Sequence, residues 1–137
     1  MLDSYGRNIH YLRVSVTDRC NLRCQYCMPE EGVQWLPHSR ILSFEQIRDV
    51  VAAAVGLGFD KVRLTGGEPL VRKGIEDLVS MLSGIPGLSH LAMTSNGTLL
   101  APLASVLASN GLRSINISLD TLDPERYASI TRGGKLS

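Results

Sequence analysis

The sequence predicts an α/β fold in which about four parallel β-strands, each followed by a helix, form a partial (β/α) TIM-like barrel. Short strand patterns alternate with amphipathic helices along the chain, and such repeats imply right-handed crossovers and a parallel sheet. Polar and apolar residues alternate within the strands, whereas a sheet covered on both faces would be apolar on both. The 137 residues, 44% of them apolar, fit a single domain.

The strands are expected at 11–16, 61–65, 90–94 and 113–118. In the first strand Val14 alternates with Arg13, and in the second Val62 alternates with Arg63. We therefore expect helices on the apolar face and a polar, cationic face lining the barrel lumen, where a ligand would bind. The alternative is a polar face that is merely solvated.

The helices have recognisable start signals. Ser43 followed by Gln46 is a capping box, and Leu42 is expected to pack on Ile47 as a hydrophobic staple. Asp123 is expected as an N-cap before a proline at the first helical position. The residues expected to face the core are Phe44, Ile47, Val51 and Ala54 in the first helix, Ile75, Leu78, Val79 and Leu82 in the second, and Leu103, Val106 and Leu107 in the third.

The four strand ends are rich in small and polar residues. They read TDRCNLRCQYC, TGGEPL, TSNGT and SLD. Because chemistry in parallel α/β folds gathers where the strands end, we expect these loops to surround a ligand. In the second loop, Gly66 and Gly67 are expected to let a ligand approach the backbone. Glu68 would offer a carboxylate to a ligand ammonium group, or would be solvated in a tight turn.

All three cysteines of the chain lie in the stretch CNLRCQYC, at positions 20, 24 and 27. This spacing is too compact for separate elements, so one loop must wrap one centre. A structural zinc ion would need a fourth ligand, such as His10 or His38. An iron–sulfur cubane held by three cysteines would keep one iron open to a substrate or cofactor. Unligated thiols are the third alternative.

The bulk properties argue against several classes of protein. The net charge is +1 and shows no basic footprint for nucleic acid. The N-terminus has no apolar signal segment, and the longest apolar run, VVAAAVGLGF, is too short to span a membrane. Three clustered cysteines do not form a disulfide framework. We expect a cytoplasmic protein with reduced thiols and neither a nucleic acid nor a membrane as partner.

The cysteine stretch and the GGEP turn together resemble the radical S-adenosylmethionine (SAM) superfamily. The longer phrases YLRVSVTDRCNLRCQYCMP, VRLTGGEPLVR, TSNGTLL and INISLD are similar to those of the GTP 3′,8-cyclases of molybdenum-cofactor biosynthesis. The resemblance runs from Ile9 to Gly133. It implies radical cyclisation of GTP to 3′,8-cyclo-7,8-dihydro-GTP by a lyase that needs a reducing electron donor. Family members are often dimers, which makes a homodimer an expectation without a located interface.

The resemblance also implies site residues, none of them catalytic apart from the cluster. The ligands to three irons of a [4Fe–4S] cluster would be Cys20, Cys24 and Cys27, with SAM on the fourth iron. The positions that match SAM contacts are Tyr26, Gly67 and Ser118. The positions that match GTP contacts are Arg13, Arg63 and Thr94. The remaining cations considered, which are interpreted as solvated, are Arg19, Lys61, Arg72 and Lys73.

The sequence departs from the family in length. Family members are more than twice as long and carry a second cysteine triplet for another cluster, which has no counterpart here. The chain is therefore expected to be the N-terminal part of a radical SAM core, with an unpaired fourth strand, weak GTP binding and impaired turnover. The alternatives are a non-catalytic iron–sulfur or zinc module, or a radical SAM enzyme acting on another substrate such as a peptide.

Overall fold

The computed structural model describes residues 2–136 as one parallel sheet with helices. The strands lie in the order β1-β2-β3-β4. In chain order the elements are β1 (Tyr11–Ser15), η1 (His38–Arg40), α1 (Phe44–Gly56), β2 (Lys61–Thr65), η2 (Pro69–Val71), α2 (Ile75–Ser83), β3 (His90–Ser95), α3 (Leu100–Ser109), β4 (Ser114–Ile117) and α4 (Pro124–Thr131). A sheet whose spatial order follows the chain order is an arc of a barrel, because a doubly wound sheet reverses its order. The predicted fold class is confirmed.

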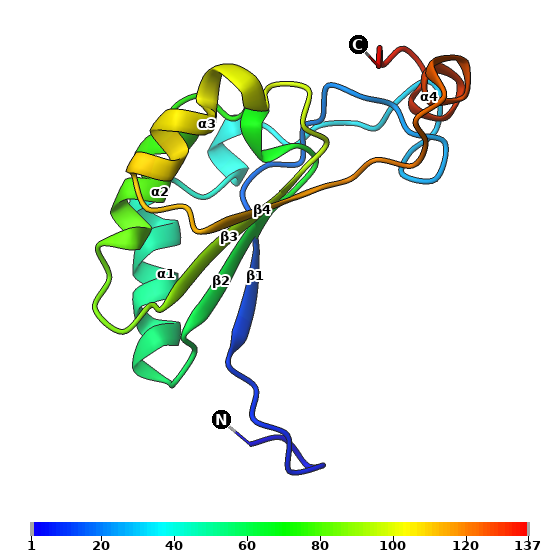
Figure 1. The fold of residues 1–137 in the computed structure, drawn as a ribbon. Coiled ribbons are helices and arrows are strands. Elements are labelled where there is room, and N and C mark those ends of the chain that lie inside the picture. Colours follow the sequence, from blue (N-terminus) through cyan, green and yellow to red (C-terminus); the bar gives the residue numbers. More distant parts are fainter. Residues whose placement is uncertain (1, 137) are drawn as a thin grey trace.

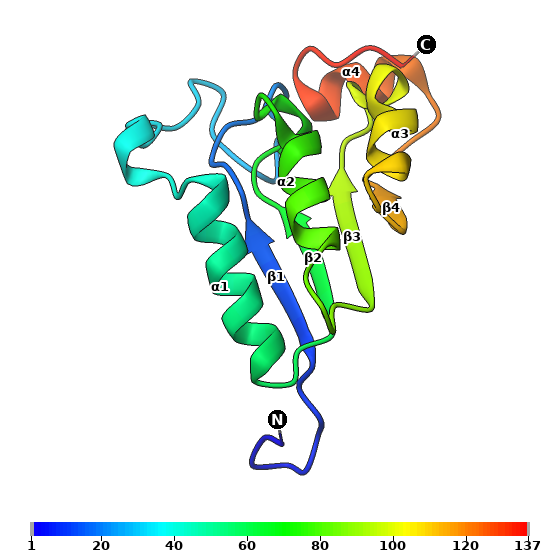
Figure 2. The same ribbon diagram turned by 90° about the vertical axis from the view of Figure 1, so that its left-hand side faces the viewer.

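The helices cover one face of the sheet. Figures 1 and 2 show α1, α2 and α3 side by side against that face, while α4 lies beyond the carboxyl ends of the strands. No helix within residues 2–136 covers the opposite face of the sheet (Figure 1). The fold therefore leaves one sheet face and the strand-end loops available for a site.

The strands alternate as the sequence predicts. In β2 the side chains of Val62 and Leu64 are fully buried, whereas Lys61 is exposed and Arg63 is half-buried. Parallel pairing sets Arg63 beside Arg13 of β1, so the cations share the polar face. The core is formed by apolar side chains from the sheet and helices, including Ile47, Val51, Ile75, Leu78, Val79, Leu82, Leu91, Met93 and Leu107.

The helix predictions hold with two exceptions. The capping box is present, with Ser43 Oγ accepting from the backbone of Gln46, and Asp123 caps α4. Val106 was expected to face the core but is 37% exposed, because α3 packs on the core through its neighbours Leu103 and Leu107. Leu42, expected to form the staple, is 50% exposed. Within the described residues no helix is long and apolar enough to cross a membrane.

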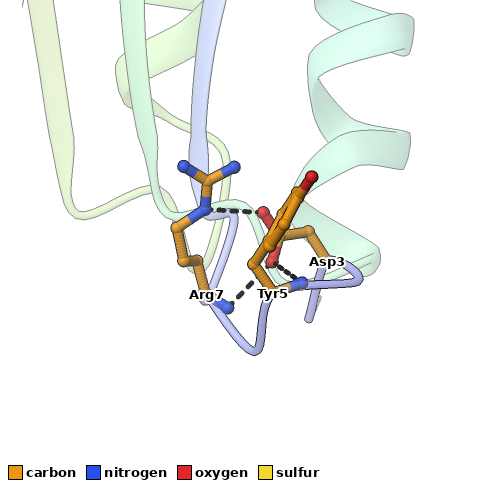
Figure 3. A network of polar contacts seen from close by, with 3 residues as sticks. All are labelled: Asp3, Tyr5 and Arg7. Carbon is orange, nitrogen blue, oxygen red and sulfur yellow. Dashed lines mark hydrogen bonds and ion pairs between the residues drawn. The ribbon is translucent and has the colours of Figure 1, made fainter.

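A small polar turn lies ahead of β1. Figure 3 shows Asp3 accepting hydrogen bonds from the backbone N–H groups of Tyr5 and Arg7, both at 2.9 Å, and pairing with the Arg7 guanidinium at 2.7 Å. These bonds hold the pKa of the Asp3 carboxyl below its usual range. The turn lies before β1, at the end of the sheet opposite the loops that follow the strands (Figure 1).

Candidate functional site

The loops that follow the strands surround a cavity of about 200 Å³. Its walls come from all four strand ends, as the distribution of polar residues predicted. Eight of the nine predicted site residues line this cavity, namely Arg13, Cys20, Cys24, Tyr26, Cys27, Gly67, Thr94 and Ser118. The fold thus brings together residues that are up to 105 positions apart in the sequence, Arg13 and Ser118.

The three cysteines are free thiols on one wall of this cavity, in the loop of residues 20–28, called the cysteine loop below. Its turn is closed by backbone bonds from Cys27 and Met28 to the carbonyl of Cys24, at 2.9 and 3.2 Å. No three of the described His, Cys, Asp and Glu side chains lie close enough to hold a single metal ion. Soft thiolates are the usual ligands of iron–sulfur clusters, and all three thiols line one cavity. The residues therefore fit an iron–sulfur cluster.

Two of the thiols have pKa values above the usual range of cysteine. Burial, followed by repulsion from the neighbouring cysteines, raises the pKa values of Cys24 and Cys27. For Cys24 the neighbouring Tyr26 side chain acts on the pKa in the opposite direction. Because a metal centre binds thiolates, its binding must release the protons of these thiols.

The structure contradicts the zinc site that would use His10 or His38. His10 precedes β1, where its Nδ1 lies 2.6 Å from Asp60 Oδ1. His38 lines a different cavity, of about 510 Å³. Neither histidine lines the wall that carries the cysteines.

The Gly66–Gly67 turn is glycine-rich because the chain's own backbone passes beside it. A Cβ atom on Gly66, whose φ is +149°, would collide with the carbonyl oxygen of Thr17. A Cβ atom on Gly67 would lie 2.6 Å from the carbonyl carbon of Arg19. The N–H groups of Gly67 and Glu68 donate to the carbonyls of Thr17 and Arg19, each at 2.8 Å. We expected a ligand to approach this turn closely. In the structure it is residues 17–19, which lead into the cysteine loop, that pack against it.

Glu68 is an internal hydrogen-bond acceptor and is only 1% exposed. Its Oε1 accepts from Leu70 N at 3.0 Å and from Ser95 Oγ at 2.8 Å, and its Oε2 accepts from Asn96 N at 2.7 Å. The carboxylate thereby joins the loop after β2 to the loop after β3. The solvated alternative is wrong, and the carboxylate binds protein donors where a ligand ammonium group was expected.

Replacing Glu68 with glutamine is expected to lower the free energy of unfolding by about 1–3 kcal/mol, because the new amide presents a donor to the N–H of Asn96. Urea denaturation measures the change. Glu31→Gln, at an exposed position, is the control and should change stability by less than about 0.5 kcal/mol. Equal stability of the two variants would contradict the role assigned to Glu68.

Tyr26 ties the middle of the cysteine loop to the segment after β4. Its hydroxyl donates to Asp120 Oδ2 at 2.9 Å, while the residue is 63% exposed. Partial burial and this hydrogen bond raise the pKa of the Tyr26 hydroxyl. Ser118 enters the same wall through a bond from its N–H to the carbonyl of Ser95, at 2.8 Å. Asp120 was missed as a contact residue, although it is the last letter of the strand-end sequence SLD.

The predicted GTP residues form a connected group with one member outside the cysteine cavity. Arg13 and Thr94 line that cavity, whereas Arg63 lines a neighbouring cavity of about 470 Å³ together with Lys61. Arg63 Nη1 donates to Thr94 Oγ1 at 3.2 Å, and its Nε donates to the hydroxyl of Tyr11. Lys61, interpreted as solvated, is exposed but lines a cavity.

The prediction that Arg72 is solvated is wrong, because its guanidinium binds other parts of the chain. Its guanidinium donates to the carbonyls of Val16 and Leu42 and lies 4.3 Å from the ring centre of Phe44. Burial lowers its pKa. No sequence pattern marked it, because the partners are backbone carbonyls that only the fold brings together. Arg72 fixes the end of β1 just before the cysteine loop.

Comparison with known proteins agrees with this geometry. The family model of the radical SAM superfamily matches residues 14–137. A GTP 3′,8-cyclase from Pelotomaculum thermopropionicum is 61% identical over 137 residues, which are the whole of this chain and 42% of that protein. A GTP 3′,8-cyclase from Geobacter sulfurreducens is 53% identical over 136 residues and is likewise covered to 42%.

A solved structure shares the fold. Streptococcus suis SuiB bound to S-adenosylmethionine superimposes with a TM-score of 0.72 at 19% identity, covering 90% of this chain and 26% of that one. The chain spans about two fifths of the length of the curated relatives it matches. Because the superfamily model covers more than nine tenths of the residues, the chain belongs to the radical SAM superfamily.

Proposed function

We propose that this chain forms the cluster- and SAM-binding part of a GTP 3′,8-cyclase in molybdenum-cofactor biosynthesis. The observation that carries the proposal is one cavity in which three cysteines face the Gly66–Gly67 turn and Ser118. The cyclases that match the whole chain at 61% identity support the reaction. The cofactors of the superfamily are a [4Fe–4S] cluster and SAM.

In this proposal Cys20, Cys24 and Cys27 would hold the [4Fe–4S] cluster, and SAM would bind beside it in the same cavity. When bound, the cluster and SAM would supply the radical chemistry that the cyclisation of GTP requires. The chain's own residues orient the cofactor. An ammonium group only donates hydrogen bonds, so Gly67 would receive that of the methionine through its carbonyl, while its N–H donates to Thr17.

Two further residues that line the cavity complete the proposed SAM site. The backbone of Tyr26 would contact the adenine, and the bond from its hydroxyl to Asp120 holds that part of the loop. The hydroxyl of Ser118 would contact SAM from the end of β4, where its backbone is bonded to Ser95.

The proposed triphosphate site rests on two arginines. Arg13 and Arg63 are paired in register on adjacent strands and on the same face of the sheet. Like charges directly opposite one another destabilise a sheet, and a bound polyanion would offset this repulsion. The Thr94 hydroxyl, which already accepts from Arg63, would bind the same nucleotide.

The experiment is anaerobic reconstitution of the chain with iron and sulfide, followed by chemical reduction in the presence of SAM. We expect a bound cluster and formation of 5′-deoxyadenosine. The conversion of GTP, assayed in parallel, should be impaired relative to a longer relative such as the Geobacter cyclase. A chain that stays free of iron, or that takes up zinc instead, would refute the proposal. The external electron donor and a homodimer stay predictions, the latter checked by sedimentation.

Replacing Arg13 with alanine is expected to weaken GTP binding about tenfold, because one charge-assisted phosphate contact is lost. Calorimetry of GTP and guanosine separates the phosphate contribution, since guanosine binding should not change. Arg126→Ala, at an exposed position on α4, is the matched control. Equal losses for GTP and guanosine would remove Arg13 from the phosphate site.

A further inference from the structure

The last turn of α4 is bonded to the backbone on both sides of Cys24. Arg23 N donates to the carbonyl of Thr131 at 3.0 Å, and Gln25 N donates to that of Ile130 at 2.9 Å. The last carbonyls of a helix have no partner within the helix. In this chain two backbone N–H groups of the cysteine loop donate to these carbonyls.

Arg132, the residue after α4, adds a side-chain contact to the same loop. Its Nη1 donates to the carbonyl of Met28 at 3.0 Å and reaches that of Arg23 at 3.5 Å. Arg23 directly precedes Cys24 and Met28 directly follows Cys27. One guanidinium group therefore contacts both ends of the Cys24–Cys27 segment, from a position 104 residues beyond Met28.

The backbone of Arg132 is in a conformation that usually calls for glycine. Its φ is 51° and its ψ is 59°, and it is the only residue other than glycine with positive φ within residues 2–136. Helices commonly end on glycine in this left-handed conformation, and Gly133 and Gly134 follow directly. A residue other than glycine keeps this conformation only where the surrounding structure holds it. Here the bonds from the Arg132 side chain to the cysteine loop contribute to that hold.

We propose that Arg132 is a positioning residue for the cluster, setting the separation of Cys24 and Cys27 by holding both ends of their segment. The inference rests on the proposed cluster ligands. Arg132 itself is held in place by α4, where Tyr127 and Thr131 are buried and Gly134 N donates to Thr131 Oγ1 at 3.0 Å. The loop is therefore shaped by the docked helix as well as by its own sequence.

The test is the Arg132→Gly variant of the whole chain, which removes the guanidinium and the backbone strain together. We expect an unchanged or higher melting temperature, faster hydrogen exchange at the amides of Arg23 and Gln25 in the metal-free protein, and about tenfold weaker cluster retention against a chelator. Arg132→Lys keeps a cation and the same backbone strain, and it should restore part of the retention. A loss of retention without a loss of stability is the signature of positioning.

Arg126→Ala, on the exposed side of α4, is the control and should retain the cluster like the unmodified chain. Equal cluster retention by the Arg132→Gly variant and the unmodified chain would overturn the inference. It would also fall if cluster retention simply followed melting temperature across the variants. If the unmodified chain binds no cluster, the proposed function fails instead, and the exchange rates of the metal-free protein still decide whether Arg132 holds the loop.

Discussion

Replacing Cys24 with alanine is expected to abolish cluster binding. A cubane left with two cysteine ligands loses a charged thiolate bond that no other cysteine in this chain can replace. The backbone of the loop should survive, because Cys24 closes its turn through its carbonyl, which accepts from Cys27 and Met28. The loss can therefore be attributed to the sulfur atom. Iron and sulfide content per chain, with visible absorbance under anaerobic conditions, measures it.

Glu31→Gln, at an exposed position shortly after the cysteine loop, is the control, because it leaves the three cysteines and the backbone bonds of the loop in place. It should retain iron at close to the level of the unmodified chain. Circular dichroism should be the same for both variants. Undiminished absorbance in the Cys24→Ala protein would remove Cys24 from the ligand set and return the cysteines to the class of unligated thiols.

The sheet and its outward face could be predicted because they follow from local periodicity. Alternation of Val62 and Leu64 with Arg63 is visible in five consecutive residues, and the fold reproduces it. Parallel strands then bring all their carboxyl ends to one edge, so gathering eight of the nine site residues required no knowledge of loop conformation. Arg63 is the exception, because it lines the neighbouring cavity, where its Nε donates to the hydroxyl of Tyr11.

What sequence reasoning missed depends on contacts between distant backbones. Arg72 binds two carbonyls, of Val16 and Leu42, and a carbonyl leaves no signature in a sequence. Glu68 was read as a ligand group or a solvated one because its donors Ser95 and Asn96 lie on another loop. Nothing in the sequence marks Arg132, because its positive φ angle and its carbonyl partners depend on the fold. In each case the charged residue can be read from the sequence, but the group that it binds cannot, because the fold alone brings the two together.

Replacing Gly67 with alanine is expected to damage both the fold and the cluster site. The added Cβ atom would meet the backbone of Asp18 and Arg19, with the Asp18 carbonyl oxygen at 2.9 Å. Backbone has no alternative rotamer, so the segment leading into the cysteine loop would have to move. Crowding of this kind costs about 1–3 kcal/mol and occasionally more. Urea midpoints and iron content, measured on the same preparation, should fall together.

Gly56→Ala is the opposite case in the same protein. Gly56 ends α1, and a Cβ atom there would meet nothing within 4 Å. Because alanine suits a helix better than glycine, this variant should gain up to about 1 kcal/mol and keep its iron. The two substitutions are chemically identical, so a difference between them isolates the close approach of the Gly66–Gly67 turn to the chain before Cys20. If Gly67→Ala were as stable and as well loaded as Gly56→Ala, the two loops would not be packed as described, and the cavity between them would lose its basis.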